Sequence, residues 1–424
     1  MEFLPDAVLE YILSYINNAR DVASCISVSK RWQESIPYIK RLYFPRNIFD
    51  TSLSRNSANV NPDETILRIV SMVEKLEELI VYCPFSSSGL TSWLSVASKS
   101  LKHLELRIDG LSENPAFPQD STSKLDCLGA ANNLESLTLW GVFMSQPPRW
   151  EVFHNLRNLE IVGVRMEDHT LVDALKFCPN VNRLSLLGCE GVRSVSINLK
   201  DLEECRLDFY GIGNNSVFIS CPKLTNLEIQ GGSSIRVPET KRLRNMSISN
   251  SGGKVCLVDF GKLVALETLS MRGVQWRWDA ISKMLELASE VKHLFMKVEF
   301  TGDFENLIAF PAIDFAEFFN AHPKLKKFDI HGAMFAALCS RDSLKNIDSN
   351  FTIPCLEEAV ITIRSPLNAE QKISTLESIV KYAGNLKKLV LKILQMKSCH
   401  NGTDDFFEDV WKFTHIHRKI ARIE

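Results

Sequence analysis

The chain has 424 residues, of which 45% are hydrophobic and 24% charged, and a formal net charge of −2. This length exceeds what one compact core needs and suits a small domain joined to an extended one. The near-neutral charge gives no polybasic character, so we expect neither nucleic acid nor a membrane surface as a partner. No run of about 18 apolar residues predicts a membrane-spanning helix, and the N-terminus lacks the pattern of a secretory signal.

The 11 cysteines indicate the cellular compartment. They are odd in number, form no Cys-x-x-Cys pair, and fall mainly where a small buried apolar residue fits, as at Cys178 and Cys221. A disulfide framework is therefore not expected. A reducing compartment is favoured, and we expect the protein in the nucleus or the cytoplasm.

Residues 1–45 predict a short helical domain. Apolar residues at positions 8, 9, 12, 13 and 16 form one helical stripe, and Asp21 is a candidate cap for a second helix. The segment closes with Val-Ser-Lys-Arg-Trp at residues 28–32. Because about 40 such residues rarely form a stable core alone, the first repeats or a partner should cover part of this apolar surface.

This N-terminal segment resembles an F-box, through its Leu-Pro start, its apolar stripe and the run at residues 28–32. The resemblance implies that the domain docks on the Skp adaptor of an SCF ubiquitin ligase. The adaptor-contacting positions that it implies are Leu4, Pro5, Leu9, Ile12, Leu13, Ile16, Val28 and Trp32.

A polar join follows the F-box-like segment and leads into a helical pattern that begins at Pro62, a residue suited to a first helical turn. We predict a linker and a first convex helix over residues 46–75.

From residue 76 onward, a phrase with apolar residues at positions 1, 4 and 6 recurs along the chain. Six copies, of which residues 134–141 are the first, also carry glycine at position 8; looser copies bring the number to about 13 over residues 76–400. Most spacings lie near the roughly 20–29 residues typical of leucine-rich repeats. Positions 4 and 6 would face the core from a strand, and the glycine would take a positive φ and let the chain leave by a tight turn.

The segments between the phrases predict how the other side of each repeat is built. Helical spacing is present at residues 168–177, 278–289 and 369–383. Between residues 202 and 266 the phrases lie closer together, which favours turns or short 3₁₀ pieces.

Two insertions and the C-terminal tail complete the pattern. Residues 109–124 and 300–311 are expected to be loops. The tail, residues 401–424, is acidic and then basic, an order that suits the helix dipole and predicts a C-terminal capping helix.

The predicted fold class is α/β: a short all-α F-box, then an irregular leucine-rich-repeat solenoid with a parallel sheet on its concave side and helices and turns on its convex side. The whole chain resembles the F-box/leucine-rich-repeat proteins, most closely plant-type members. The resemblance implies a substrate-recognition subunit of an SCF E3 ubiquitin ligase. In that role the Skp adaptor would bring the cullin and RING subunits, and the repeats would bind an unknown target protein. The alternative is an F-box scaffold or small-molecule sensor that acts outside ubiquitin transfer.

No catalytic, metal or cofactor site is predicted. His415 and His417, two residues apart on a helix, would lie on different faces, and no cysteine lies in a nucleophile signature. We therefore expect a non-catalytic adaptor.

Aromatic residues near the strand ends are the candidates for target binding, since large aromatics beside a concave surface often anchor partners. The alternative is that they fill gaps between neighbouring repeats. The candidates are Trp140, Phe143, Trp150, Trp276, Trp278 and Phe304.

Overall fold

The computed structural model describes residues 5–49, 61–109, 122–211, 215–303, 306–340, 344, 347–394 and 403–424. The chain divides into two compact units, Met1–Phe209 and Tyr210–Glu424. Across the described ranges, no helix is both long and apolar enough to cross a membrane.

The first unit opens with a bundle of short helices, two of which are capped at the N-terminus by polar side chains. Asn18 accepts a hydrogen bond from the backbone N–H of Arg20 at 3.0 Å, and Ser29 accepts one from that of Trp32 at 3.4 Å. Asn18 is thus the cap of the second helix, and the cap predicted at Asp21 is wrong because that residue lies within the first turn. The elements are α1 (Asp6–Leu13), α2 (Ala19–Ile26), α3 (Lys30–Ser35) and the 3₁₀ turn η1 (Ile36–Tyr38).

A short strand, β1 (Arg41–Phe44), joins this helical bundle to the repeats. It pairs in parallel with β2 (Glu78–Val81). The backbone N–H of Tyr43 also donates to the carbonyl of Asn17 at 2.7 Å, in the segment between α1 and α2. The sheet therefore begins within the segment that resembles an F-box.

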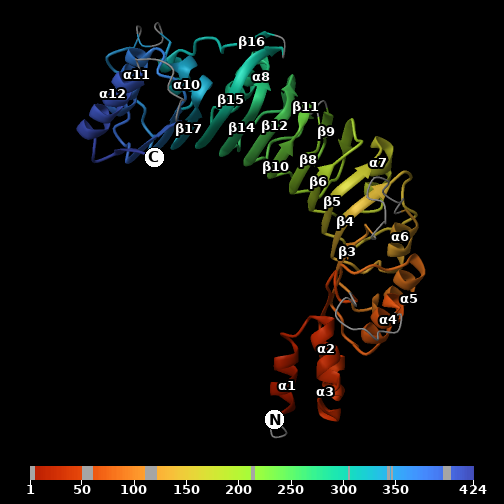
Figure 1. Cartoon of the computed structure of the whole chain (residues 1–424). Coiled ribbons are helices and arrows are strands. Elements are labelled where there is room, and N and C mark those ends of the chain that lie inside the picture. Colours follow the sequence, from red (N-terminus) through yellow and green to blue (C-terminus); the bar gives the residue numbers. More distant parts are fainter. Residues whose placement is uncertain are drawn as a thin grey trace. The chain divides into compact units, whose positions relative to one another are not determined.

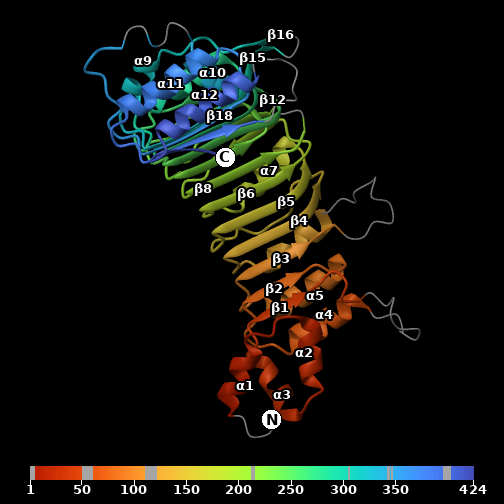
Figure 2. The same ribbon diagram turned by 60° about the vertical axis from the view of Figure 1, so that its left-hand side comes forward.

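The remaining strands of the first unit follow in chain order, each parallel to its neighbour (Figure 2). They are β3 (His103–Arg107), β4 (Ser136–Met144), β5 (Asn158–Met166), β6 (Arg183–Cys189) and β8 (Glu204–Phe209). Helices lie along one side of these strands (Figure 1). They are α4 (Pro62–Ser71), α5 (Ser87–Ala97), α6 (Thr122–Asp126), the 3₁₀ turn η2 (Cys127–Ala130) and α7 (Asp168–Lys176), which packs on β7 (Ser194–Ile197).

The second unit repeats this arrangement. Its parallel strands, again in chain order, are β10 (Asn226–Gln230), β12 (Asn245–Val255), β14 (Thr268–Trp276), β15 (His293–Asp303), β17 (Lys327–His331), β18 (Glu358–Ile363), β19 (Lys388–Ile393) and β20 (Ala421–Ile423). Its helices are α8 (Trp278–Leu287), α9 (Phe315–Ala321), α10 (Gly332–Leu338), α11 (Ala369–Tyr382) and α12 (Thr403–Ile416). In both units we call the sheet face that turns away from the buried phrase leucines the open face.

Each of the thirteen phrases contains one of these parallel strands, which confirms the predicted α/β repeat fold. In the phrase at residues 134–141, the leucines at positions 1, 4 and 6 are fully buried, while Glu135 is exposed. The strands β1 and β20 lie outside the phrases and were not predicted. Both are only three or four residues long, too short to show a pattern.

The six glycines at position 8 all have positive φ, between 36° and 140°, as predicted. The predicted tight turn is wrong for β4, because this strand continues through Gly141. Leu137 and Leu139 face the core before the glycine, and Val142 and Met144 face it afterwards. The left-handed glycine therefore shifts the alternation by one residue and keeps apolar side chains on the core side, while the register with β5 is the same before and after it.

Three further expectations for the segments between phrases can be compared with the structure. Where short turns were predicted, the strands β9 (Asn215–Ile219), β11 (Gly232–Val237) and β13 (Leu257–Phe260) form a parallel sheet. In the predicted loop at 300–311, β15 continues and pairs in antiparallel fashion with β16 (Asn306–Ile308). Most of the predicted loop at 109–124 lies outside the described residues.

A glycine-to-alanine comparison tests the need for glycine at these positions. In Gly163→Ala the new Cβ meets only ordinary contacts, so the cost should come from the φ of 64° alone. We expect a loss of about 1–2 kcal/mol in the free energy of unfolding, measured by urea denaturation followed by circular dichroism. The matched control is Gly384→Ala, where no positive φ and no neighbour within 4 Å oppose the substitution; it should change stability by less than about 0.5 kcal/mol. Equal losses in both variants would contradict a requirement for the left-handed conformation.

Candidate functional site

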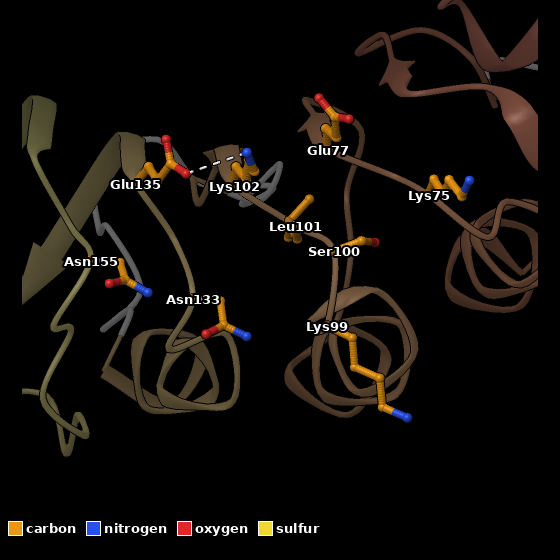
Figure 3. A pocket seen from close by; sticks show the side chains of 9 residues that line it. All are labelled: Lys75, Glu77, Lys99, Ser100, Leu101, Lys102, Asn133, Glu135 and Asn155. Carbon is orange, nitrogen blue, oxygen red and sulfur yellow. Dashed lines mark ion pairs between the residues drawn. The ribbon is translucent and has the colours of Figure 1, made fainter.

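A surface depression lies where the chain enters β2, β3 and β4, and its charges are largely neutralised (Figure 3). Lys102 forms an ion pair of 3.5 Å with Glu135. Lys40 donates a hydrogen bond of 2.8 Å to Glu77 and lowers the pKa of that carboxyl. The Lys99 side chain points away from the ion pair of Lys102 and Glu135 in Figure 3. The hydroxyl of Ser100, which also lines the depression, donates to the backbone carbonyl of Leu76 at 2.9 Å.

Within the residues that the structure describes, no group of three or more histidine, cysteine, aspartate or glutamate side chains could hold a metal ion. The His415 ring stacks on Trp411 at a centroid distance of 5.3 Å, whereas the His417 ring contacts Phe413 at 4.8 Å. The two histidines therefore lie against different neighbours, and only His415 belongs to α12, which ends at Ile416.

Most of the described cysteines are buried in the core. Cys178 and Cys189 lie at the ends of a helix and a strand with almost no exposed surface, and burial raises the pKa of each thiol to about 12. A thiol of this kind is neutral at physiological pH and does not act as a nucleophile.

Alkylation tests this burial. Iodoacetamide at pH 8 should modify the half-buried Cys256 and Cys355 in the native protein, but Cys178 and Cys189 only after unfolding in urea. For the thiols of Cys178 and Cys189, the pKa in the folded state lies above the unfolded value of about 8.5. Their contribution to the free energy of unfolding is therefore fully present below pH 8.5 and is lost as the pH rises towards 12. Mass spectrometry of tryptic peptides measures each site. Native labelling of Cys178 at the rate of Cys256 would contradict the assignment.

The helix α1 has two different apolar faces. Leu9 and Leu13 are buried in the helical bundle. Val8 and Tyr11 of α1, and Tyr15 in the turn that follows the helix, are spaced three and four residues apart and form a stripe on the opposite, solvent-facing side, where the two tyrosines are 64% and 71% exposed. The expectation that Leu9 and Leu13 offer contact surface is therefore corrected, because their side chains build the core that holds the bundle together.

The other predicted adaptor-contacting residues lie on or near the surface. Pro5 and Val28 are exposed, while Ile12, Ile16 and Trp32 are half-buried. Leu4 lies outside the described residues. Their contact with an adaptor stays a prediction.

Polar contacts fix the bundle on which this surface lies. The guanidinium of Arg31, in α3, forms an ion pair with Asp6, in the first turn of α1, at 2.6 Å. The hydroxyl group of Tyr15 donates to that of Tyr11 at 2.9 Å, on the exposed side of this bundle.

Two of the aromatic residues predicted to bind a target are buried, which corrects that expectation. The indole N–H of Trp150 donates to the carbonyl of Leu125 at 2.7 Å, and that of Trp276 to the carbonyl of Arg272 at 3.0 Å. Both indole rings are almost completely covered, so they fill gaps between neighbouring repeats. Phe304 lies outside the described residues.

Trp140, in contrast, lies on the open face of the first unit. It is 38% exposed, and its indole N–H donates to the carboxylate of Glu105 at 2.7 Å. The same carboxylate accepts the hydroxyl of Tyr82, whose ring packs edge-on against Tyr43 at 5.6 Å. Burial and the hydrogen bond to Glu105 both raise the pKa of the Tyr82 hydroxyl. Trp140 is thus an exposed aromatic side chain with a fixed orientation.

The two remaining candidates are half-buried. Phe143 lies three residues after Trp140 in β4, with the guanidinium of Arg165 5.9 Å from its ring. Trp278 begins α8 in the second unit, with its ring 6.1 Å from that of Phe310. Each keeps some exposed surface, and target binding by either stays a prediction.

Alanine substitutions test whether Trp150 is buried in the core and Trp140 is exposed at the surface. Trp150→Ala should lower the free energy of unfolding by about 3–5 kcal/mol, because it leaves a large cavity. Trp140→Ala should lower it by no more than about 1 kcal/mol, because the ring already faces solvent. Thermal unfolding of both variants beside the wild-type chain measures the difference. A larger loss for Trp140→Ala than for Trp150→Ala would contradict the burial described above.

The comparisons with known proteins agree with this arrangement. Residues 1–44 match the family model described as F-box-like, and residues 90–301 match the model described as "FBD-associated F-box protein At5g56370, LRR repeats". The chain is also 56% identical to the F-box protein At1g10780 of Arabidopsis thaliana over 424 residues, which is 100% of both chains. The chain belongs to the F-box/leucine-rich-repeat family.

The exposed stripe of α1 is the main feature that the sequence reasoning missed. Its signal was present, because Val8, Tyr11 and Tyr15 recur at helical spacing. The stripe overlaps a second apolar stripe on the same helix, and hydrophobic periodicity alone does not say which of the two faces the core.

Proposed function

We propose that this F-box protein is the substrate-recognition subunit of an SCF ubiquitin ligase. In this role the helical bundle binds the Skp adaptor, and through it the cullin and RING subunits, while the repeats bind a target protein. The observation that carries the proposal is the exposed apolar stripe Val8–Tyr11–Tyr15, displayed on an F-box that is directly joined to leucine-rich repeats.

The stripe is well suited to a protein interface. Large apolar side chains on one helix face lose little conformational entropy when they dock, and tyrosine combines apolar area with a polar tip. Burying the rings of Tyr11 and Tyr15 against a partner would remove from water the most exposed apolar area of α1.

The repeats provide a separate surface for the target. Trp140 on the open face of the first unit has the features of an interface anchor, namely a large ring, partial exposure and an orientation fixed by Glu105. The proposed role requires binding and positioning only, so the protein itself needs no catalytic residue.

Adaptor capture by the full chain tests this proposal. Tyr11→Asp and Val28→Asp each place a charge on the predicted contact surface and should weaken binding to a purified Skp adaptor at least about tenfold. The matched control is Tyr210→Asp, which makes the same chemical change at an exposed tyrosine of the second unit and should leave adaptor binding unchanged. Biolayer interferometry gives the affinities, and far-ultraviolet circular dichroism checks folding.

The comparison with a buried position distinguishes contact from folding. Leu9→Asp should also abolish binding, but by disrupting the helical bundle, visible as lost helical signal. If Tyr11→Asp and Val28→Asp both bind as tightly as the wild type, the proposed docking surface is wrong. If the wild-type chain binds no Skp adaptor at all, the protein acts as a scaffold outside ubiquitin transfer.

A further inference from the structure

The open face of the second unit carries two neighbouring cations on its central strands. Arg272 on β14 lies directly beside Lys297 on β15 in the strand register (β14 and β15 in Figure 1). Both side chains are exposed. Neighbouring strands are about 4.8 Å apart, so the two charged groups arise from adjacent points of the sheet and repel each other.

The acidic side chains nearest to this pair along the sheet are Glu299 and Asp329. Glu299, two residues beyond Lys297, forms an ion pair with Arg364. Asp329 on β17 lies beside Phe295 in the strand register and 3.2 Å from the His331 ring. Within the described part of the chain, neither Arg272 nor Lys297 forms an ion pair.

The guanidinium of Arg272 is held in position by its surroundings. It lies over the ring of Phe295 at 4.4 Å, and its Nε donates to the hydroxyl of Ser270 at 3.1 Å. The Phe295 ring in turn contacts the His331 ring at 5.3 Å. A guanidinium fixed through one edge and one face still presents its terminal N–H groups to solvent. These groups can bind a carboxylate with two parallel hydrogen bonds at a small cost in side-chain entropy.

We propose that this site, formed by Arg272, Lys297 and Phe295, binds an acidic peptide segment of the target protein. The proposal rests on the proposed function, since it names the chemistry of the target that the repeats recognise. Arg272 would bind one carboxylate in bidentate fashion, Lys297 would neutralise a second, and the ring of Phe295 would contact the aliphatic part of the peptide. Charge complementarity selects an acidic segment, because a basic one would meet two cations that form no ion pair within the chain.

A peptide-binding experiment with the full chain tests the site. The probes are three fluorescein-labelled 12-residue peptides of alternating sequence, Glu-Ser, Gln-Ser and Lys-Ser, measured by fluorescence anisotropy at 50 mM and 300 mM salt. The wild-type chain should bind the Glu-Ser peptide tightest and lose affinity at 300 mM salt. The double variant Arg272→Gln/Lys297→Gln should bind it about five- to tenfold more weakly.

Two further variants make the result specific. The control Lys241→Gln/Arg242→Gln removes the same charge from two exposed residues in the turn before β12 and should bind like the wild type. The charge reversal Arg272→Glu/Lys297→Glu should prefer the Lys-Ser peptide to the Glu-Ser peptide. The proposal is overturned if the wild type binds Glu-Ser no better than Gln-Ser, or if the control loses as much affinity as the neutralised site.

Adaptor capture by the same variants separates this proposal from the ligase role. Arg272 and Lys297 lie far along the chain from the helical bundle, so the neutralised variant should bind a Skp adaptor with wild-type affinity. Adaptor binding without preference for the acidic peptide overturns the proposed site alone. Preference for the acidic peptide without adaptor binding overturns the ligase role, and with it the identification of the peptide as part of a ubiquitination target.

Discussion

The structure depends on one constraint, which is that no single repeat can bury its own apolar face. Leu134, Leu137 and Leu139 lose all contact with water only because the neighbouring strands place the same kinds of residue beside them, as in Leu137 beside Leu159. Removing apolar area from water is the main favourable contribution to folding, at about 25 cal/mol per Å². The parallel register, the glycines with positive φ and the short covering helices all serve to keep this row of apolar side chains continuous.

The same constraint explains why the open face is free to carry function. Side chains alternate along a strand, so every buried leucine leaves a neighbour that the core does not use. In the first unit these neighbours include Trp140 and Glu105, and in the second they include Arg272 and Lys297. One sheet architecture thus carries different exposed residues in the two units, while the alternation of buried apolar residues that holds the strands together is kept.

The sequence predicted the repeat fold because its signal is local and repeated many times. The phrase positions marked the strands, and the fixed glycines marked the backbone positions with positive φ. The errors arose where the signal depends on tertiary context. Trp150 and Trp276 resemble surface anchors in the sequence, yet neighbouring repeats cover them completely. Leu9 and Tyr11 both belong to apolar stripes of one helix, and only the positions of α2 and α3 decide which stripe is inside.

The short strand β1 limits rotation between the helical bundle and the first repeats. A peptide link between two domains usually bends, because few contacts resist rotation about it. Here the chain leaves the helical bundle already paired with β2, and Tyr43 is tied back to Asn17 by a backbone hydrogen bond. Rotating the helical bundle relative to the first repeats would require breaking several of these hydrogen bonds at once. In a flexible linker, the same rotation needs only changes in backbone dihedral angles. A protein bound to α1 is therefore restricted in how far it can rotate relative to the open face of β2, β3 and β4.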